Sequence, residues 1–125
     1  MKNVLLAGCG GFIGTCFRYL LNTLIYRLFN YPAFPYGTII INILGCLIIG
    51  LLSGLAESRN IITPELRIFI FIGILGGFTT FSTFGYETFA LLRDSEYFLA
   101  SANVLTQVFV GVIAVGLAYN FARTL

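Results

Sequence analysis

The sequence predicts an all-α integral membrane protein with four transmembrane helices. Only 10% of its 125 residues are charged and 58% are hydrophobic, whereas soluble domains carry about 25% charged residues. Three windows contain at most one charged residue each, and each exceeds the roughly 20 residues that a helix needs to cross the bilayer core. We expect one transmembrane domain, residues 1–125, with spans at about residues 3–29, 36–56, 65–92 and 97–122.

The first span is the least certain by hydropathy, because Arg18 and Arg27 interrupt residues 4–29. Lys2 before an apolar stretch also resembles a signal peptide, but no polar domain follows it. Nothing with a soluble composition separates this window from the start of the chain. We therefore predict a membrane helix here.

The glycines of the first span resemble a nucleotide-binding loop at positions 8, 11 and 14. However, Ile13 stands where the G-x-G-x-x-G pattern requires its last glycine, and no acidic residue precedes Glu57. In a membrane helix, Gly10 and Gly14 instead form a G-x-x-x-G face. This face predicts that another helix approaches closely.

Short polar or proline-containing segments separate the spans, at residues 30–35, 57–60 and 93–96. Thr63, Pro64 and Glu65 provide an N-cap, a proline at the first helical position and an acid in the first turn, which predicts where the third span begins. From there to residue 93 a helix would be longer than one straight crossing requires. The surplus length leaves room for a break near its middle.

Basic residues are distributed with little bias across the predicted topology. Four lie on the side shared by the two termini and two on the other: Lys2, Arg59, Arg67 and Arg123 against Arg27 and Arg93. Because the positive-inside rule then sets orientation only weakly, the chain could insert both ways and form an antiparallel homodimer. A monomer with one fixed topology is an equally open alternative.

Composition also excludes several kinds of function. The chain has no histidine, the commonest general base and metal ligand, and we expect no enzymatic activity. Its net charge of +2 is too small to indicate nucleic acid binding. Cys9, Cys16 and Cys46 are odd in number and form no Cys-x-x-Cys pair, so we interpret them as small packing residues.

The polar side chains inside the first two spans each have two interpretations. Arg18 is the only charge deep in the first span; it either snorkels or pairs with a carboxylate, or it forms a cationic vestibule that concentrates anions. Asn42 is the only side-chain amide of the second span, and Thr38 lies on the same helical face. Asn42 either holds helices together or donates a hydrogen bond to an anion that has lost its water.

The strongest signal is the sequence Gly-Gly-Phe-Thr-Thr-Phe-Ser-Thr-Phe at residues 76–84. The paired glycines weaken a helix, and the hydroxyls can satisfy the backbone groups that a break releases. A break at membrane depth is tolerated where it is buried in protein or lines a cavity. Carbonyls released there could hold a cation, and the hydroxyls could meet an anion.

Phe78, Phe81 and Phe84 recur every third residue within this segment, so we expect them to lie near one another. Such a stripe usually serves packing, but the electropositive edge of an aromatic ring can also coordinate a small anion. Glu87 follows on the next turn as the only carboxylate inside a span. Proton coupling, an ion pair with Arg18 and a hydrogen bond that fixes the break are all open roles for it.

The fourth span carries one polar stripe. Asn103 and Gln107 are four residues apart, with Thr106 beside them and Gly111 one turn further on. This polar stripe either packs against other parts of the protein or lines a pore, and the sequence leaves both open.

In these residues the sequence resembles the CrcB/Fluc family of fluoride channels along essentially its whole length. The matching segments are residues 10–14 with Arg18 and Tyr19, residues 37–42 with Gly45 and, most specifically, residues 76–84. The resemblance implies an antiparallel dual-topology homodimer in the cell membrane, surrounded by lipid. It also implies passive, highly selective export of fluoride from the cytoplasm, which relieves fluoride toxicity.

The resemblance further implies roles for individual residues. Phe81 and Phe84 would line the fluoride path with their ring edges, and Asn42 would donate to the ion. Backbone carbonyls of Gly76 and Thr79 from both subunits would hold a structural Na⁺ at the dimer centre. The remaining polar residues of the path would be Thr38, Ser82, Thr83, Glu87 and Arg18, with Asn103 and Gln107 in the positions where the family often presents a tyrosine and a serine.

Two alternative functions belong to other classes of membrane protein. A proton-coupled exporter like the small multidrug resistance proteins would need a carboxylate in the first span, where this chain has Arg18. A structural subunit without transport activity would not explain why polar residues gather around one helix break.

Overall fold

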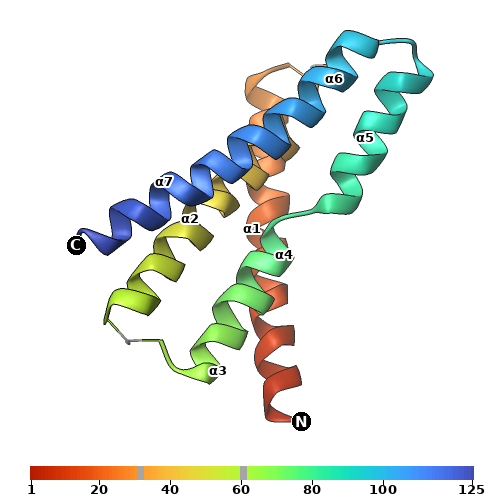
Figure 1. Ribbon diagram of the computed structural model, residues 1–125. Helices are drawn as coiled ribbons and strands as arrows, with labels where there is room; N and C mark the ends of the chain where they lie inside the picture. The colour runs from red at the N-terminus through yellow and green to blue at the C-terminus, as the bar shows by residue number, and fades with distance from the viewer. Residues whose placement is uncertain (31–32, 60–61) are drawn as a thin grey trace.

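The computed structural model describes residues 1–30, 33–59 and 62–125. Four long helical spans run through them: α1 (Lys2–Leu28), α2 (Tyr36–Arg59), a third span (Pro64–Arg93) and a fourth span (Tyr97–Arg123) (Figure 1). All four are long and apolar enough to cross a membrane. The predicted all-helical, four-span architecture is therefore confirmed. Of the predicted closing segments, positions 31, 32 and 60 lie outside the described residues.

The third span begins as the sequence predicts. The Thr63 side chain accepts a hydrogen bond from the backbone N–H of Leu66 at 3.2 Å, and Pro64 occupies the first turn. The span then consists of α3 (Pro64–Arg67), the π-helix η1 (Ile68–Leu75), α4 (Gly76–Phe78) and α5 (Phe81–Arg93).

Two residues between α4 and α5 have extended backbones. Thr79 has φ −84° and ψ 161°, and Thr80 has φ −152° and ψ 112°. Hydroxyl groups satisfy nearby backbone groups: the Thr79 hydroxyl donates to the carbonyl of Leu75 at 2.9 Å, and the Thr80 hydroxyl accepts from the N–H of Thr83 at 3.3 Å. Thr80 is therefore the N-cap of α5.

The turn into the fourth span is closed by a residue in the left-handed region, Ser95 at φ 63°. The N–H of Glu96 donates to the carbonyl of Leu91 at 2.8 Å, and that of Ser95 donates to Leu92 at 3.1 Å, the pairing of a Schellman motif. The span consists of α6 (Tyr97–Leu105), the π-helix η2 (Thr106–Val110) and α7 (Gly111–Arg123).

Glycines allow α1 to pack closely on η1 and α4, which are its main neighbours. A Cβ on Gly10 would lie 2.9 Å from the Cα of Gly73, and a Cβ on Gly14 would lie 2.8 Å from the backbone N of Phe78. Real Cβ atoms do not approach other atoms so closely. The predicted G-x-x-x-G packing face of the first span is therefore confirmed.

A second glycine pair holds α2 against α7, and the sequence analysis did not identify it. A Cβ on Gly50 would lie 3.0 Å from the Cα of Val115, and a Cβ on Gly54 would lie 2.7 Å from the Cβ of Ala122. α2 packs mainly on α7, and α5 packs on α6. The molecule is thus built from three helix pairs, with the extended residues of the third span between two of them (Figure 1).

Both termini lie on the same side as the connection between α2 and α3. Lys2 pairs with Glu65 at 3.3 Å, and the Arg59 guanidinium donates to the carbonyl of Leu125. The Tyr119 hydroxyl also donates to Glu57 at this end. The count of basic residues placed the two termini on one side of the membrane, and this arrangement agrees with that placement.

The single chain presents many large apolar side chains outward, including Phe12 at 73% and Phe98 at 83% exposure. Cys9 and Cys16 are exposed as well. The packing role expected of these two therefore stays a prediction, whereas the Cys46 sulfur lies 3.3 Å from where a Cβ on Gly111 would be.

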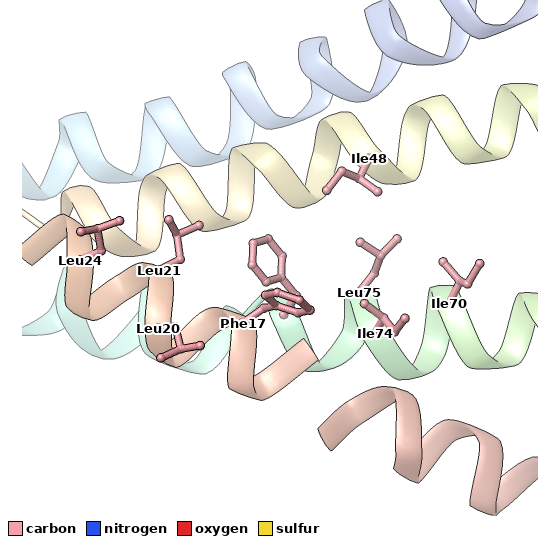
Figure 2. Close-up of a pocket in the computed structure, with 9 residues that line it drawn as sticks. Phe17, Leu20, Leu21, Leu24, Ile48, Ile70, Ile74 and Leu75 are labelled. Carbon is pink, nitrogen blue, oxygen red and sulfur yellow. The ribbon is translucent and has the colours of Figure 1, made fainter. Parts of the chain in front are cut away.

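Apolar side chains also line a hollow of about 520 Å³ between α1, α2 and η1 (Figure 2). Its walls include Leu20, Leu21 and Leu24 from α1, Ile48 from α2 and Ile74 from η1 (Figure 2). It offers no polar group to an ion. In a bilayer, such surfaces contact lipid chains or another protein.

Candidate functional site

The side chain of Asn42 replaces the helical partners that the extended residues lack. Its Oδ1 accepts from the backbone N–H of Thr80 at 3.0 Å, and its Nδ2 donates to the carbonyl of Thr80 at 3.3 Å. In a continuous helix the Thr80 N–H would bond to the carbonyl of Gly76. Asn42 therefore ties α2 to the middle of the third span.

Further amides continue from Asn42 into the fourth span. Asn42 Nδ2 donates to Gln107 Oε1 at 2.6 Å, Gln107 Nε2 donates to Asn103 Oδ1 at 2.8 Å, and Asn103 Nδ2 donates to the Thr88 hydroxyl at 2.9 Å. The Thr88 hydroxyl in turn donates to the carbonyl of Phe84 at 2.8 Å. The polar stripe of the fourth span thus faces protein in this chain.

Three hydroxyls gather where α5 begins. The Thr80 hydroxyl lies 3.3 Å from that of Ser82 and 3.0 Å from that of Thr83. Ser82 and Thr83 are exposed. Because hydroxyls rotate and both donate and accept, this cluster can offer hydrogen-bond donors to an anion.

Thr38 is buried and donates its hydroxyl to Glu87 Oε1 at 2.7 Å, which joins α2 to α5. The other carboxylate oxygen, Oε2, is buried with no hydrogen-bond partner among the described residues. Neither of the salt bridges between the described residues involves Glu87. Of the roles that the sequence left open for it, the structure records the hydrogen-bonded one.

Phe81 and Phe84 pair at a ring-centroid distance of 5.4 Å with their planes 54° apart. Phe81 is 82% exposed, whereas Phe78 is buried and lines the apolar hollow of Figure 2. The expectation that all three rings cluster is therefore wrong for Phe78. The extended Thr79 and Thr80 explain this, because the spacing of one helix does not continue across them.

Arg18 reaches the third span, where its Nη1 donates to the carbonyl of Thr79 at 3.4 Å. It lines a hollow of about 220 Å³ between α1, α2 and α5. The other polar residues of this hollow are Thr15, Tyr19, Asn22, Thr38, Thr80 and Thr83. A guanidinium among hydroxyls attracts anions.

A second hollow, of about 330 Å³, is lined by both Asn42 and Phe81. Gly76 and Thr79 line it, and Thr80 lines both hollows. The extended residues therefore lie between the hollow lined by Arg18 and the hollow lined by the exposed ring of Phe81.

The structure brings most of the predicted site residues into this one region, with three additions. The Thr80 hydroxyl, which was expected to satisfy a released backbone group, accepts from the N–H of Thr83 and so caps α5. Thr88 supplies a hydrogen bond that the sequence did not predict, and the Thr15 hydroxyl lies 3.5 Å from the carbonyl of Gly77. The role of Thr80 as N-cap could have been recognised, because threonine is a preferred N-cap residue. Nothing in the sequence pattern distinguishes Thr88.

Known proteins resemble this one along essentially the whole chain. The family model described as "CrcB-like protein, Camphor Resistance (CrcB)" matches residues 5–119. A protein of Chlorobaculum tepidum named "Fluoride-specific ion channel FluC" is 46% identical over 100% of this chain and 94% of its own length.

Proteins of the same name from two other organisms are similarly close. The one from Geotalea uraniireducens is 45% identical over the full length of both chains. The one from Methylobacillus flagellatus is 40% identical over 98% of this chain and 96% of its own length. With four helices suited to cross a bilayer, the chain is a multi-pass cell membrane protein, and it belongs to the CrcB family.

Proposed function

We propose that the chain is a passive, highly selective fluoride channel rather than an enzyme or a pump. The observation that carries the proposal is the cluster of hydrogen-bond donors around Thr79 and Thr80, next to the pair of Phe81, which is exposed, and Phe84. Full-length relatives named fluoride-specific ion channels support the choice of ion. Export from the cytoplasm would relieve fluoride toxicity.

The proposed path runs from the Arg18 hollow to the phenylalanine pair. The guanidinium concentrates anions at the first end, and the hydroxyls of Ser82 and Thr83 replace part of the ion's water. Asn42 then donates an N–H to the ion. Because a selective pore must bind an ion weakly enough to release it, the electropositive ring edges of Phe81 and Phe84 suit the next step.

A complete path requires a second copy of the chain. Phe81 is 82% exposed in a single chain, so one copy leaves the pair open to its surroundings. An antiparallel homodimer, inserted in both orientations, would cover it. The weak bias of basic residues supports dual topology, because little charge asymmetry opposes the inverted orientation.

The residues present fit a structural Na⁺ at the dimer centre. The extended backbone removes the helical partner of the Gly76 carbonyl, since the Thr80 N–H bonds to Asn42 instead. Among the described residues the Thr79 carbonyl accepts one long contact, from Arg18, and it has a second lone pair. Released carbonyls at membrane depth are suitable Na⁺ ligands, and bound Na⁺ would supply positive charge that joins two copies of this segment.

A liposome efflux assay tests the channel. Purified protein in liposomes should release fluoride down its gradient in the presence of Na⁺, should exclude chloride, and should lose this flux in Phe81→Ile. Phe98→Ile is the matched control, since Phe98 is equally exposed and is not one of the site residues. Proton-driven drug exchange without fluoride flux, abolished in Glu87→Gln, would overturn the proposal.

Orientation requires its own experiment. A single cysteine in a background without Cys9, Cys16 and Cys46, placed at the exposed Ser95, should be labelled from both sides of the membrane in cells. Labelling from one side only would rule out dual topology and leave the fluoride assay unaffected.

A further inference from the structure

A one-directional row of hydrogen bonds joins two backbone groups of the third span. The row starts at the Thr80 N–H, passes through Asn42, Gln107, Asn103 and Thr88, and ends at the carbonyl of Phe84. A backbone N–H can only donate and a backbone carbonyl can only accept. The two ends therefore fix the direction of every bond between them.

This direction sets the orientation of the Asn42 amide. If the amide were rotated by half a turn, its NH₂ group would face the Thr80 N–H, and its oxygen would face the oxygen of Gln107. Both contacts would be repulsive. Gln107 has no freedom to rotate in compensation, because its own NH₂ group is held by Asn103, which is fully buried.

The two hydrogens of the Asn42 NH₂ group are held unequally. One is directed to Gln107 Oε1 at 2.6 Å and the other to the Thr80 carbonyl at 3.3 Å. The longer bond is the weaker one. The strong bond to Gln107 therefore anchors the amide and leaves the second hydrogen available to a passing ion.

We propose that Gln107 is a positioning residue for ion transfer, acting through Asn42, and that Asn103 and Thr88 fix the orientation of Gln107. The inference rests on the proposed fluoride channel. The local backbone supports it, because Gln107 lies in the π-helix η2, and π-helical turns are frequent at functional sites. The wider turn of the π-helix lets Gln107 reach Asn42 on α2, while Asn103, four residues earlier on α6, stays buried.

Fluoride efflux from liposomes tests the row through two substitutions. Gln107→Met removes the anchor at similar volume, whereas Asn103→Leu leaves every atom that touches Asn42 in place. Each leaves a buried amide group unpaired and should lower efflux about tenfold, which converts to about 1.4 kcal/mol and lies within the cost of one unpaired buried group. The double variant should lower it by no more than about a further twofold, because both changes break the same row. Asn120→Leu, in the same span but bonded only to the carbonyl of Gly116, should match wild type.

A spectroscopic readout separates positioning from a general packing role. In protein labelled with ¹⁵N-asparagine, the Asn42 side-chain signal, assigned by its loss in Asn42→Leu, should shift on adding fluoride. In Asn103→Leu that signal should lose its single position and respond less to fluoride. This measurement also applies to Gln107→Met in detergent if that variant inserts poorly.

The outcomes are distinguishable from failure of the channel itself. Wild-type protein that moves no fluoride would overturn the proposed function. Wild-type conduction with an unaltered Gln107→Met variant would overturn the positioning role alone. Additive losses in the double variant, or an Asn42 signal that Asn103→Leu leaves unchanged, would also overturn it.

Discussion

The side chain of Asn42 pairs with the backbone of Thr80 in both directions, accepting at 3.0 Å and donating at 3.3 Å. One residue of α2 thereby stands in for the helical bonds missing where the third span is extended. A side-chain amide is suited to this role because it carries a donor and an acceptor in one plane, as the peptide group does. The same amide is the proposed donor to fluoride.

Substitutions of Asn42 should affect both of its roles. Asn42→Leu leaves the Thr80 N–H without a partner, and we expect a loss of about 1–3 kcal/mol in stability. Asn42→Asp keeps the acceptor for the Thr80 N–H but places a charged oxygen where the NH₂ group faces the Gln107 oxygen and the Thr80 carbonyl. It should therefore unfold earlier than wild type in detergent and also lose most fluoride efflux.

The matched control for the charge change is Asn120→Asp on α7, which is exposed. Thermal unfolding and liposome efflux should both remain near wild type in that variant. If Asn42→Asp conducts fluoride as wild type does, Asn42 is a structural tie and not a donor to the ion.

The sequence predicted the spans, the Thr63 cap and the close approach at Gly10 and Gly14. These features depend on composition, on one local turn and on helical spacing, all of which adjacent residues determine. The residues of the candidate site were also identified, because polar groups in an apolar span are few and costly.

The hydrogen bond between Asn42 and Gln107 could not be predicted from the sequence, for a geometric reason. Which face of α2 meets the fourth span depends on helix rotation and on the π-helices η1 and η2, and a π-turn shifts every later residue around the axis. Gln107 therefore could be placed on a polar stripe but not opposite Asn42. The extended Thr79 and Thr80 likewise separated Phe78 from the stripe to which its spacing assigned it.

Enlarging Gly14 should disrupt the pairing of α1 with the third span. A Cβ there would lie 2.8 Å from the backbone N of Phe78 and would also meet the carbonyl of Ile74. Gly14→Val should cost about 1–3 kcal/mol through overpacking, read as earlier thermal unfolding in detergent. Gly8→Val is the control, because a Cβ at Gly8 meets nothing within 4 Å. Equal unfolding of the two variants would contradict the packing assigned here.

The contact between Thr38 and Glu87 predicts coupled effects on stability. In the part of the chain that the structure describes, Thr38 is the one donor to a carboxylate whose other oxygen has no partner. Thr38→Val removes it, which should cost about 1–3 kcal/mol. Adding Glu87→Gln should recover part of this loss, since a neutral amide is less costly to bury than a carboxylate. A double-mutant cycle by thermal unfolding measures the coupling. Simple additivity would show that the two side chains do not act together.

Arg18 should influence Na⁺ and fluoride in opposite directions. Its guanidinium lies 3.4 Å from the Thr79 carbonyl that is proposed to bind Na⁺, and like charges at such range repel. Arg18→Gln should therefore lower the Na⁺ concentration that gives half-maximal fluoride efflux, by about threefold or more. The maximal efflux should fall at the same time, because the vestibule loses the charge that concentrates anions.

Arg27→Gln separates this effect from a change in overall charge. Arg27 lies on the same helix but nine residues further on, about 13 Å along the axis, which exceeds the screening length at physiological salt. It should leave the Na⁺ requirement unchanged when efflux is titrated with NaCl against N-methyl-D-glucamine chloride. If Arg18→Gln also leaves that requirement unchanged, the Thr79 carbonyl is not a ligand of the ion, and the cation that joins two copies must be held elsewhere.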